Sequence, residues 1–146
     1  MGTLATSAVV SVLAGCAAVV QSRTGRALDA GHITARRGIL IGLALTATGL
    51  AAAIPGLPGV LTAAGLIGTG TGPITSLGFA ALAATTPASH FGQTLGAAKV
   101  GRELGDAGGP LLVTAVATAA TLTYGYAVLA LLLAALALVF IAMRGG

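Results

Sequence analysis

The sequence has little charge, few aromatic residues and a single cysteine. Charged residues make up 7% of its 146 residues and hydrophobic residues 56%, whereas a soluble domain carries about 25% charged residues. So few charges cannot cover the surface of a soluble fold of this size. Cys16 has no second cysteine with which to form an internal disulfide. Aromatic residues, at 3%, provide no platform for nucleic-acid bases, and we expect no nucleic-acid partner.

Five apolar segments fill most of the chain, and each approaches the length of about 20 residues that a helix needs to cross a bilayer. They are rich in alanine, leucine and valine without two-residue alternation, which favours helices over the strands of a barrel. We therefore predict an all-α fold, a polytopic membrane bundle of about five transmembrane helices in one domain, 1–146. The predicted helices cover residues 3–21, 38–54, 60–84, 92–122 and 126–143, with a cytoplasmic loop at 22–37.

The distribution of basic residues predicts the orientation of the bundle. The loop at 22–37 contains four arginines and one acidic residue, Asp29, and the positive-inside rule places it in the cytoplasm. Alternation then places the N-terminus outside and Arg144 inside, in a multi-pass protein of the cell membrane. An odd number of spans and an external start suggest a chain that lacks its beginning. Besides the lipid bilayer, we expect missing N-terminal helices or another copy as partners.

A cluster of ionisable residues lies where a membrane helix is expected. Only about 16 residues after Ala107 are free of charge, too few to span a bilayer, so the charged stretch 99–106 must be drawn partly into the membrane helix. Lys99 and Glu103 are four residues apart, as are Arg102 and Asp106, and each pair can meet on one helix face. Ionisable groups within spans are candidates for proton coupling or solute binding. The alternative is a salt-bridged cytoplasmic helix end that holds helices in register.

Glycines and hydroxyl side chains mark a second candidate region. The segment Gly68–Pro73 contains three glycines and a proline, which predicts a kinked or locally unwound helix against protein or a water-filled cavity. Four hydroxyl residues then become candidates to line a solute path, namely Thr69, Thr71, Thr75 and Ser76. Alternatively, these hydroxyls bond back to their own helix.

Glycines spaced four apart predict close helix packing in a membrane. Such spacing occurs at Gly38/Gly42, Gly68/Gly72, Gly92/Gly96 and Gly101/Gly105/Gly109. The triple is the more specific of these signals. It predicts a helix that packs closely against a neighbour or, alternatively, a flexible or close-packed helix that moves during a transport cycle.

The sequence offers no credible catalytic set. His32 and His90 lie in predicted loops without cysteine ligands at suitable spacing, and no Ser-His-Asp or Cys-His arrangement is present. We therefore expect neither an enzyme nor a metal or cofactor site.

Two motifs resemble those of the major facilitator superfamily of transporters. Gly25 and Asp29, followed by Arg36 and Arg37, are similar to its cytoplasmic loop motif G-x-x-x-D-R-x-G-R-R, although Ala30 stands where the motif has its first arginine. A second resemblance is to the core of the antiporter motif, G-x-x-x-G-P, and it involves Gly105, Gly109 and Pro110. The alanine- and arginine-rich composition looks bacterial. The resemblance implies helices eight to twelve of a twelve-helix transporter, a candidate gating role for the loop, and alternating access.

The function expected from the sequence is secondary active transport of a small solute, in the efflux direction and with protons as the candidate coupling ion. The chain is expected to be a partial transporter that would not transport alone. The alternative is a small helical membrane protein that acts as an oligomeric channel or an accessory subunit.

Overall fold

The computed structural model describes residues 2–53, 56–119 and 121–142. Within these residues there are helices and no strand, which confirms the predicted all-α fold. The elements are α1 (Thr3–Asp29), α2 (Ala35–Ala51), α3 (Leu57–Thr85), the 3-10 turn η1 (Ala88–His90), α4 (Phe91–Ala119) and α5 (Leu122–Ala142).

The first connection is much shorter than the loop expected at 22–37. Helix α1 continues to Asp29, and α2 already begins at Ala35. The segment after residue 21 contains no proline, and its arginine, alanine and leucine residues are good helix formers, so the polar residues here do not end the helix. Gly31 adopts a positive φ of 72° in the turn. Thr34 then caps α2, because its side chain accepts a hydrogen bond from the Arg37 backbone N–H.

The last helix begins earlier than the expected residue 126. Helix α5 begins at Leu122. Gly125 is buried, and a Cβ built on it would lie 2.8 Å from the carbonyl oxygen of Val113. Helix α5 therefore packs closely against α4 from its first turn.

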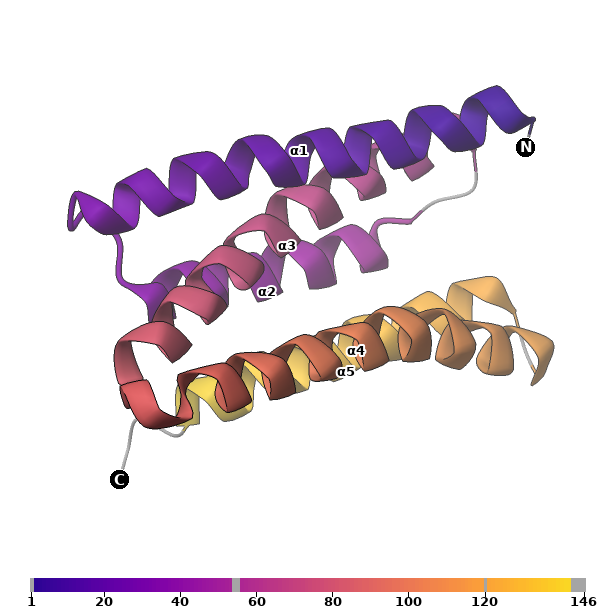
Figure 1. The fold of residues 1–146 in the computed structure, drawn as a ribbon. Coiled ribbons are helices and arrows are strands. Elements are labelled where there is room, and N and C mark those ends of the chain that lie inside the picture. Colours follow the sequence, from indigo (N-terminus) through magenta and orange to yellow (C-terminus); the bar gives the residue numbers. More distant parts are fainter. Residues whose placement is uncertain (1, 54–55, 120, 143–146) are drawn as a thin grey trace.

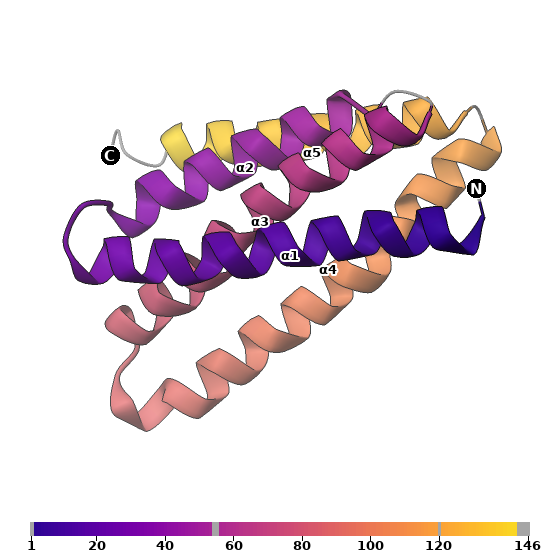
Figure 2. The same cartoon turned by 90° about the horizontal axis from the view of Figure 1, so that it is seen from above.

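The helices form two layers (Figure 1). Helices α1, α2 and α3 pack together in one layer, and α4 and α5 form the other, joined to the first mainly through contacts between α2 and α5. Seen from above, α4 crosses beneath α1 at a marked angle (Figure 2). Within the first layer, α3 packs against both α1 and α2 and lies between them.

Alternate glycines of α3 face opposite neighbours. Gly68 and Gly72 approach α1: a Cβ built on Gly68 would collide with the backbone of Leu13, and one on Gly72 would lie 2.9 Å from the Ala17 carbonyl oxygen. Gly70 approaches α2, where a Cβ would lie 2.5 Å from the Gly42 carbonyl oxygen. This arrangement follows from helix geometry, because two residues rotate by about 200° and four by about 400°.

The segment Gly68–Pro73 is helical throughout, so the predicted local unwinding does not occur. Pro73 is buried within α3, where neighbouring helices can accommodate its missing N–H group. Glycine at positions 68, 70 and 72 serves to bring three backbones together and not to break the helix.

Three of the helices are long and apolar enough to cross a membrane, namely α1, α3 and α5. Their most apolar windows are largely unburied within the chain itself. Exposed leucine and valine side chains on α1 and α5 would be unfavourable in water and suit contact with lipid. These features identify a membrane protein.

We predict that Gly70→Ala lowers the free energy of unfolding in detergent by about 1–3 kcal/mol, the usual cost of overpacking. The added Cβ would lie 2.5 Å from the Gly42 carbonyl oxygen and 2.7 Å from the Thr46 backbone nitrogen, so α2 and α3 would have to separate. Gly78→Ala is the matched control on the same helix. No atom lies within 4 Å of its Cβ position, and alanine favours the helix by up to about 1 kcal/mol. Equal stabilities of the two variants would contradict the packing described for α3.

Candidate functional site

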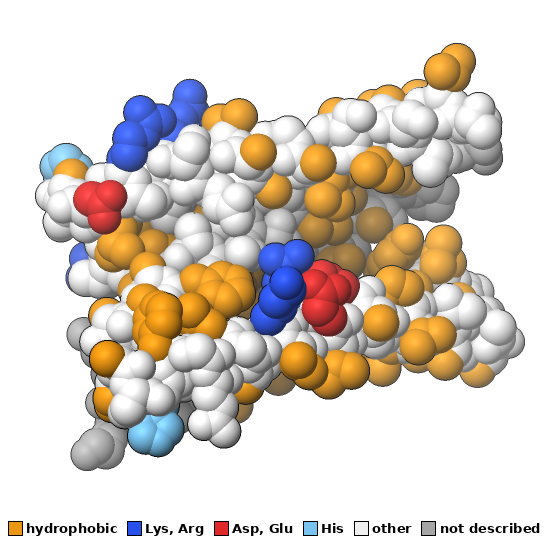
Figure 3. Space-filling model, viewed as in Figure 1, with side chains coloured by type: hydrophobic (Ala, Val, Ile, Leu, Met, Phe, Trp, Pro, Cys, Tyr) orange, Lys and Arg blue, Asp and Glu red, His pale blue; other side chains and the backbone are white. Residues whose placement is uncertain are grey.

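The four ionisable residues of α4 occupy one face in the central part of the helix. At 1.5 Å per residue, Lys99 lies about 12 Å and Asp106 about 22 Å from the start of a helix about 43 Å long. At 100° per residue, Lys99, Arg102, Glu103 and Asp106 fall within an arc of about 100°. Figure 3 shows basic and acidic side chains side by side half-way along this layer, with apolar side chains on both sides.

A different face of α4 is apolar and exposed. Val100, Leu104 and Leu111 expose 60%, 68% and 71% of their surface, and their directions are centred about 130° from those of the charged residues. No residue described in α4 is buried. The helix therefore has one face suited to lipid and another that is not.

Within the charged cluster, the structure pairs Arg102 with Asp106. The Arg102 Nε atom lies 3.5 Å from Asp106 Oδ2, one helical turn away, and the two side chains are 55% and 66% exposed. The other expected pair, Lys99 and Glu103, forms no ion pair within the described part of the chain. Lys99 and Glu103 thus have exposed charges that α4 itself does not neutralise.

One predicted path residue and one charged residue meet at a cavity between α3 and α4. The cavity has a volume of about 210 Å³, and its lining includes Thr75 of α3 and Arg102 of α4, together with Gly78, Phe79 and Leu82. Thr75 and Arg102 belong to two different candidate regions of the sequence, and no sequence pattern predicted that they would meet. The 3-10 turn η1 connects α3 to α4, and the few contacts between the two helices include the walls of this cavity.

The other predicted path residues bond back to their own helix. The hydroxyl of Thr69 donates to the Gly65 carbonyl at 2.6 Å, and that of Thr71 donates to Gly68 at 3.2 Å. Ser76 donates to Gly72 at 3.1 Å. Each hydroxyl thereby satisfies its donor locally, whereas no hydrogen bond of this kind is found for Thr75 in the described structure.

The glycine triple of α4 contacts no neighbouring helix in the described structure. A Cβ built on Gly101, Gly105 or Gly109 would meet no atom within 4 Å, and Pro110 beside them is exposed. The expected packing is found instead at Gly38, Gly42, Gly68 and Gly72. The motif-like residues Gly105, Gly109 and Pro110 therefore lie on an unpartnered part of α4.

The residues of the candidate gating loop lie on two helices. Gly25 and Asp29 belong to the end of α1, and Arg36 and Arg37 to the first turn of α2. Arg36 reaches the end of α5: its Nη2 atom donates to the carbonyl oxygens of Phe140 at 2.6 Å and Ile141 at 3.1 Å. The guanidinium carbon also lies 5.5 Å from the centroid of the Phe140 ring, within range of a cation–π interaction.

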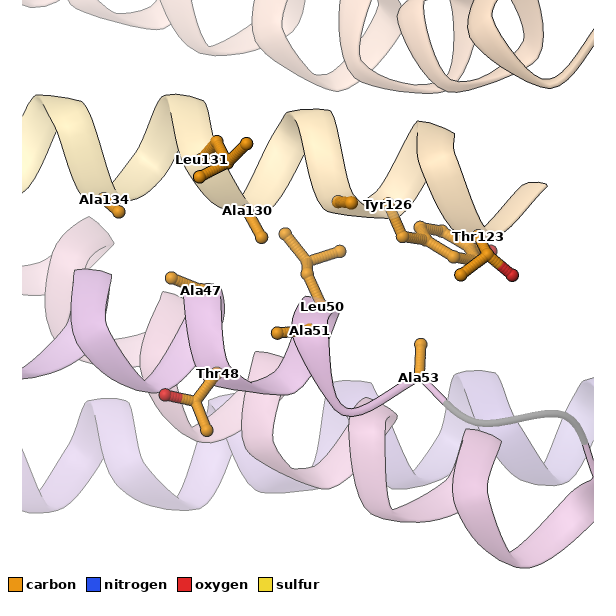
Figure 4. A pocket seen from close by; sticks show the side chains of 11 residues that line it. Ala47, Thr48, Leu50, Ala51, Ala53, Thr123, Tyr126, Ala130, Leu131 and Ala134 are labelled. Atoms are coloured by element: carbon orange, nitrogen blue, oxygen red, sulfur yellow. The ribbon is translucent and has the colours of Figure 1, made fainter. Parts of the chain in front are cut away.

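Sequence reasoning missed an apolar cavity between α2 and α5. It has a volume of about 530 Å³ and is shown in Figure 4, where Leu50 and Ala53 extend from the first layer toward Thr123 and Tyr126 of α5. A second cavity of about 490 Å³, which reaches α1 and α3, shares these four residues. The available signal was small side chains four apart on facing helices, Ala47/Ala51 and Ala130/Ala134.

No protein-family model, curated protein or solved structure matches this chain. The resemblance to the major facilitator superfamily consequently remains a prediction from the motif residues. The three helices that can span a membrane and the two faces of α4 are the structural observations that bear on function.

We predict that Arg36→Gln lowers the free energy of unfolding by about 1.5–3 kcal/mol, because hydrogen bonds from a charged donor to the end of α5 are lost. Thermal denaturation in detergent would measure the change. The stability of Arg36→Lys should lie between those of the unsubstituted protein and Arg36→Gln, since lysine keeps the charge but not the planar guanidinium group. Arg23→Gln removes an exposed arginine at the same end of the bundle and is the control. A loss no larger for Arg36→Gln than for Arg23→Gln would show that the contact does not join the layers.

Proposed function

We propose that the chain forms part of a membrane transporter of the major facilitator type, which moves a small solute by secondary active transport in the efflux direction. The observation that carries this proposal is the charged face in the middle of α4. In the proposed orientation, a multi-pass protein of the cell membrane has its N-terminus outside and the end of α5 in the cytoplasm, because the arginines between α1 and α2 favour the cytoplasmic side.

The free-energy cost of placing α4 in a membrane depends on what its charged face contacts. A charged side chain at the centre of a membrane helix costs about 3 kcal/mol by insertion measurements, so four such residues cost roughly 10 kcal/mol against lipid. The Arg102–Asp106 pair offsets only part of this cost, because each ion also carries a desolvation penalty and Lys99 and Glu103 form no pair in the described structure. The face must therefore contact water or polar protein groups, which is the environment of a solute path.

The second face of α4 supports the same placement. Val100, Leu104 and Leu111 are exposed and are suited to lipid, while α4 packs along α5, which is apolar enough to span. A helix with one lipid face and one ionisable face is expected at the wall of a path. The cavity lined by Thr75 and Arg102 lies on the path side.

Glu103 and Asp106 are the proposed coupling residues, with protons as the candidate ion. A carboxylate can bind and release a proton or hold a cationic solute, and Lys99 and Arg102 supply the compensating charge nearby. The unpartnered surface at Gly105 and Gly109 would be covered by the remaining helices of the transporter. In the alternative of an oligomeric channel or accessory subunit, a second copy would cover it.

We predict that Asp106→Asn, in the chain expressed from its complete reading frame, lowers proton-coupled transport at least about tenfold, the size expected when an essential proton-transfer group is lost. Glu103→Gln is predicted to act in the same direction. The measurement is saturable, ionophore-sensitive movement of radiolabelled small solutes in proteoliposomes. Leu111→Ala, on the exposed apolar face of α4, is the control and should leave the rate unchanged.

The double variant Arg102→Asp with Asp106→Arg separates transport from helix pairing. It preserves an ion pair across the same helical turn but moves the carboxylate. Transport should remain lost if Asp106 couples the cycle. Recovery of transport in the double variant, or unchanged proton coupling in Asp106→Asn, would assign the cluster a structural role. Absence of any saturable transport with the unsubstituted protein would favour the channel or accessory-subunit alternative.

A further inference from the structure

A cavity opens between the start of α2 and the end of α5. It has a volume of about 300 Å³ and is lined by Thr34, Arg36, Arg37, Leu40 and Ile141. The polar residues belong to the cap and first turn of α2, and Leu40 follows one turn deeper. The cavity therefore changes from cationic and hydroxyl-bearing to apolar along α2, away from its N-terminus.

The two arginines of this cavity retain unused donors. Both hydrogen bonds from Arg36 to α5 leave from Nη2, so its Nε–H and Nη1–H groups can serve another acceptor. Arg37 is exposed, and no ion-pair partner is found for it within the described residues. Thr34 accepts a hydrogen bond from the Arg37 backbone, which leaves its hydroxyl proton available for donation.

The surroundings of the cavity favour an anion. Arg23 and Arg26 lie at the same end of the bundle, where α1 ends and α2 begins, with Asp29 as the acidic residue of that connection (Figures 1 and 3). The end of α5 is the negative end of a helix dipole, but the Arg36 guanidinium is bonded to its carbonyls and offsets it.

We propose that this cavity binds the phosphate of an anionic phospholipid, independently of any transport by the protein. Arg37 and the free donors of Arg36 hold the phosphate oxygens in charge-assisted hydrogen bonds, and Thr34 donates a third contact. The acyl chains lie along Leu40 and the half-exposed Ile141. A phospholipid fits better than free phosphate, because the cavity has polar residues where the headgroup would lie and apolar residues where the acyl chains would follow. Basic pockets between helices at a membrane surface favour such headgroups.

The test is lipid titration of the purified full chain in detergent, followed by native mass spectrometry with dioleoylphosphatidylglycerol and, separately, dioleoylphosphatidylcholine. Phosphatidylglycerol should bind about tenfold more tightly than phosphatidylcholine. Arg37→Gln should lower the affinity for phosphatidylglycerol about tenfold, as expected for the loss of a charge-assisted hydrogen bond. Arg23→Gln is the matched control, because it removes the same charge from the same end of the bundle without touching the cavity. Arg37 is exposed, so its replacement should not impair folding.

Three outcomes would overturn the proposal. Equal binding of the two lipids would show that the phosphate-bearing anionic headgroup is not selected. Equal losses of phosphatidylglycerol affinity in Arg37→Gln and Arg23→Gln would indicate diffuse electrostatic attraction to the basic end of the bundle and not a specific binding site. Displacement of phosphatidylglycerol by millimolar inorganic phosphate would identify free phosphate as the ligand, since a bound lipid also retains its acyl-chain contacts.

Discussion

Direct backbone contact at the glycines of α3 is the interaction on which the rest of the bundle depends. Gly68 and Gly72 bring α3 against α1, and Gly70 brings it against α2, so one short segment joins three helices. In lipid there is little hydrophobic drive between helices, and close packing of small residues must supply the attraction. The first layer is consequently compact, while α4 and α5 attach to it through fewer contacts.

Because of this unequal packing, the ionisable cluster proposed to act in transport lies on a helix that the other helices cover little, α4. Helix α4 has no buried residue in the described structure, carries four ionisable side chains on one face and exposes large apolar side chains on another. A membrane can accept the second face but not the first without a large cost. The ionisable face, and not any single motif, is what links the fold to a proposed path for solute. At the far end of the bundle, Arg36 ties the two layers together through the carbonyls of α5.

The sequence was sufficient for the helical class, for five helices and for the continuity of α4 through its charged cluster, because length and hydropathy constrain all three. It was not sufficient for the helix ends. Polar residues after residue 21 predicted the end of the first helix, but α1 continues to Asp29. Nor could spacing tell which glycines pack: Gly68/Gly72 and Gly105/Gly109 have the same spacing, and only the first pair has a neighbour in the described structure. The Arg36 contact joins residues 104 positions apart, which no local pattern reveals.

The most direct test of the central claim is the access of water to the charged face of α4. Glu103→Cys and Leu104→Cys, each with Cys16 replaced by serine, place one thiol on the charged face or on the apolar face of the same helical turn. The chain would be expressed from its complete reading frame and treated in intact membranes with a membrane-impermeant charged thiol reagent. A solute path predicts rapid labelling of Glu103→Cys and little labelling of Leu104→Cys. No labelling at either position, or equal labelling at both, would contradict it, because α4 would then lie wholly in lipid or at the membrane surface.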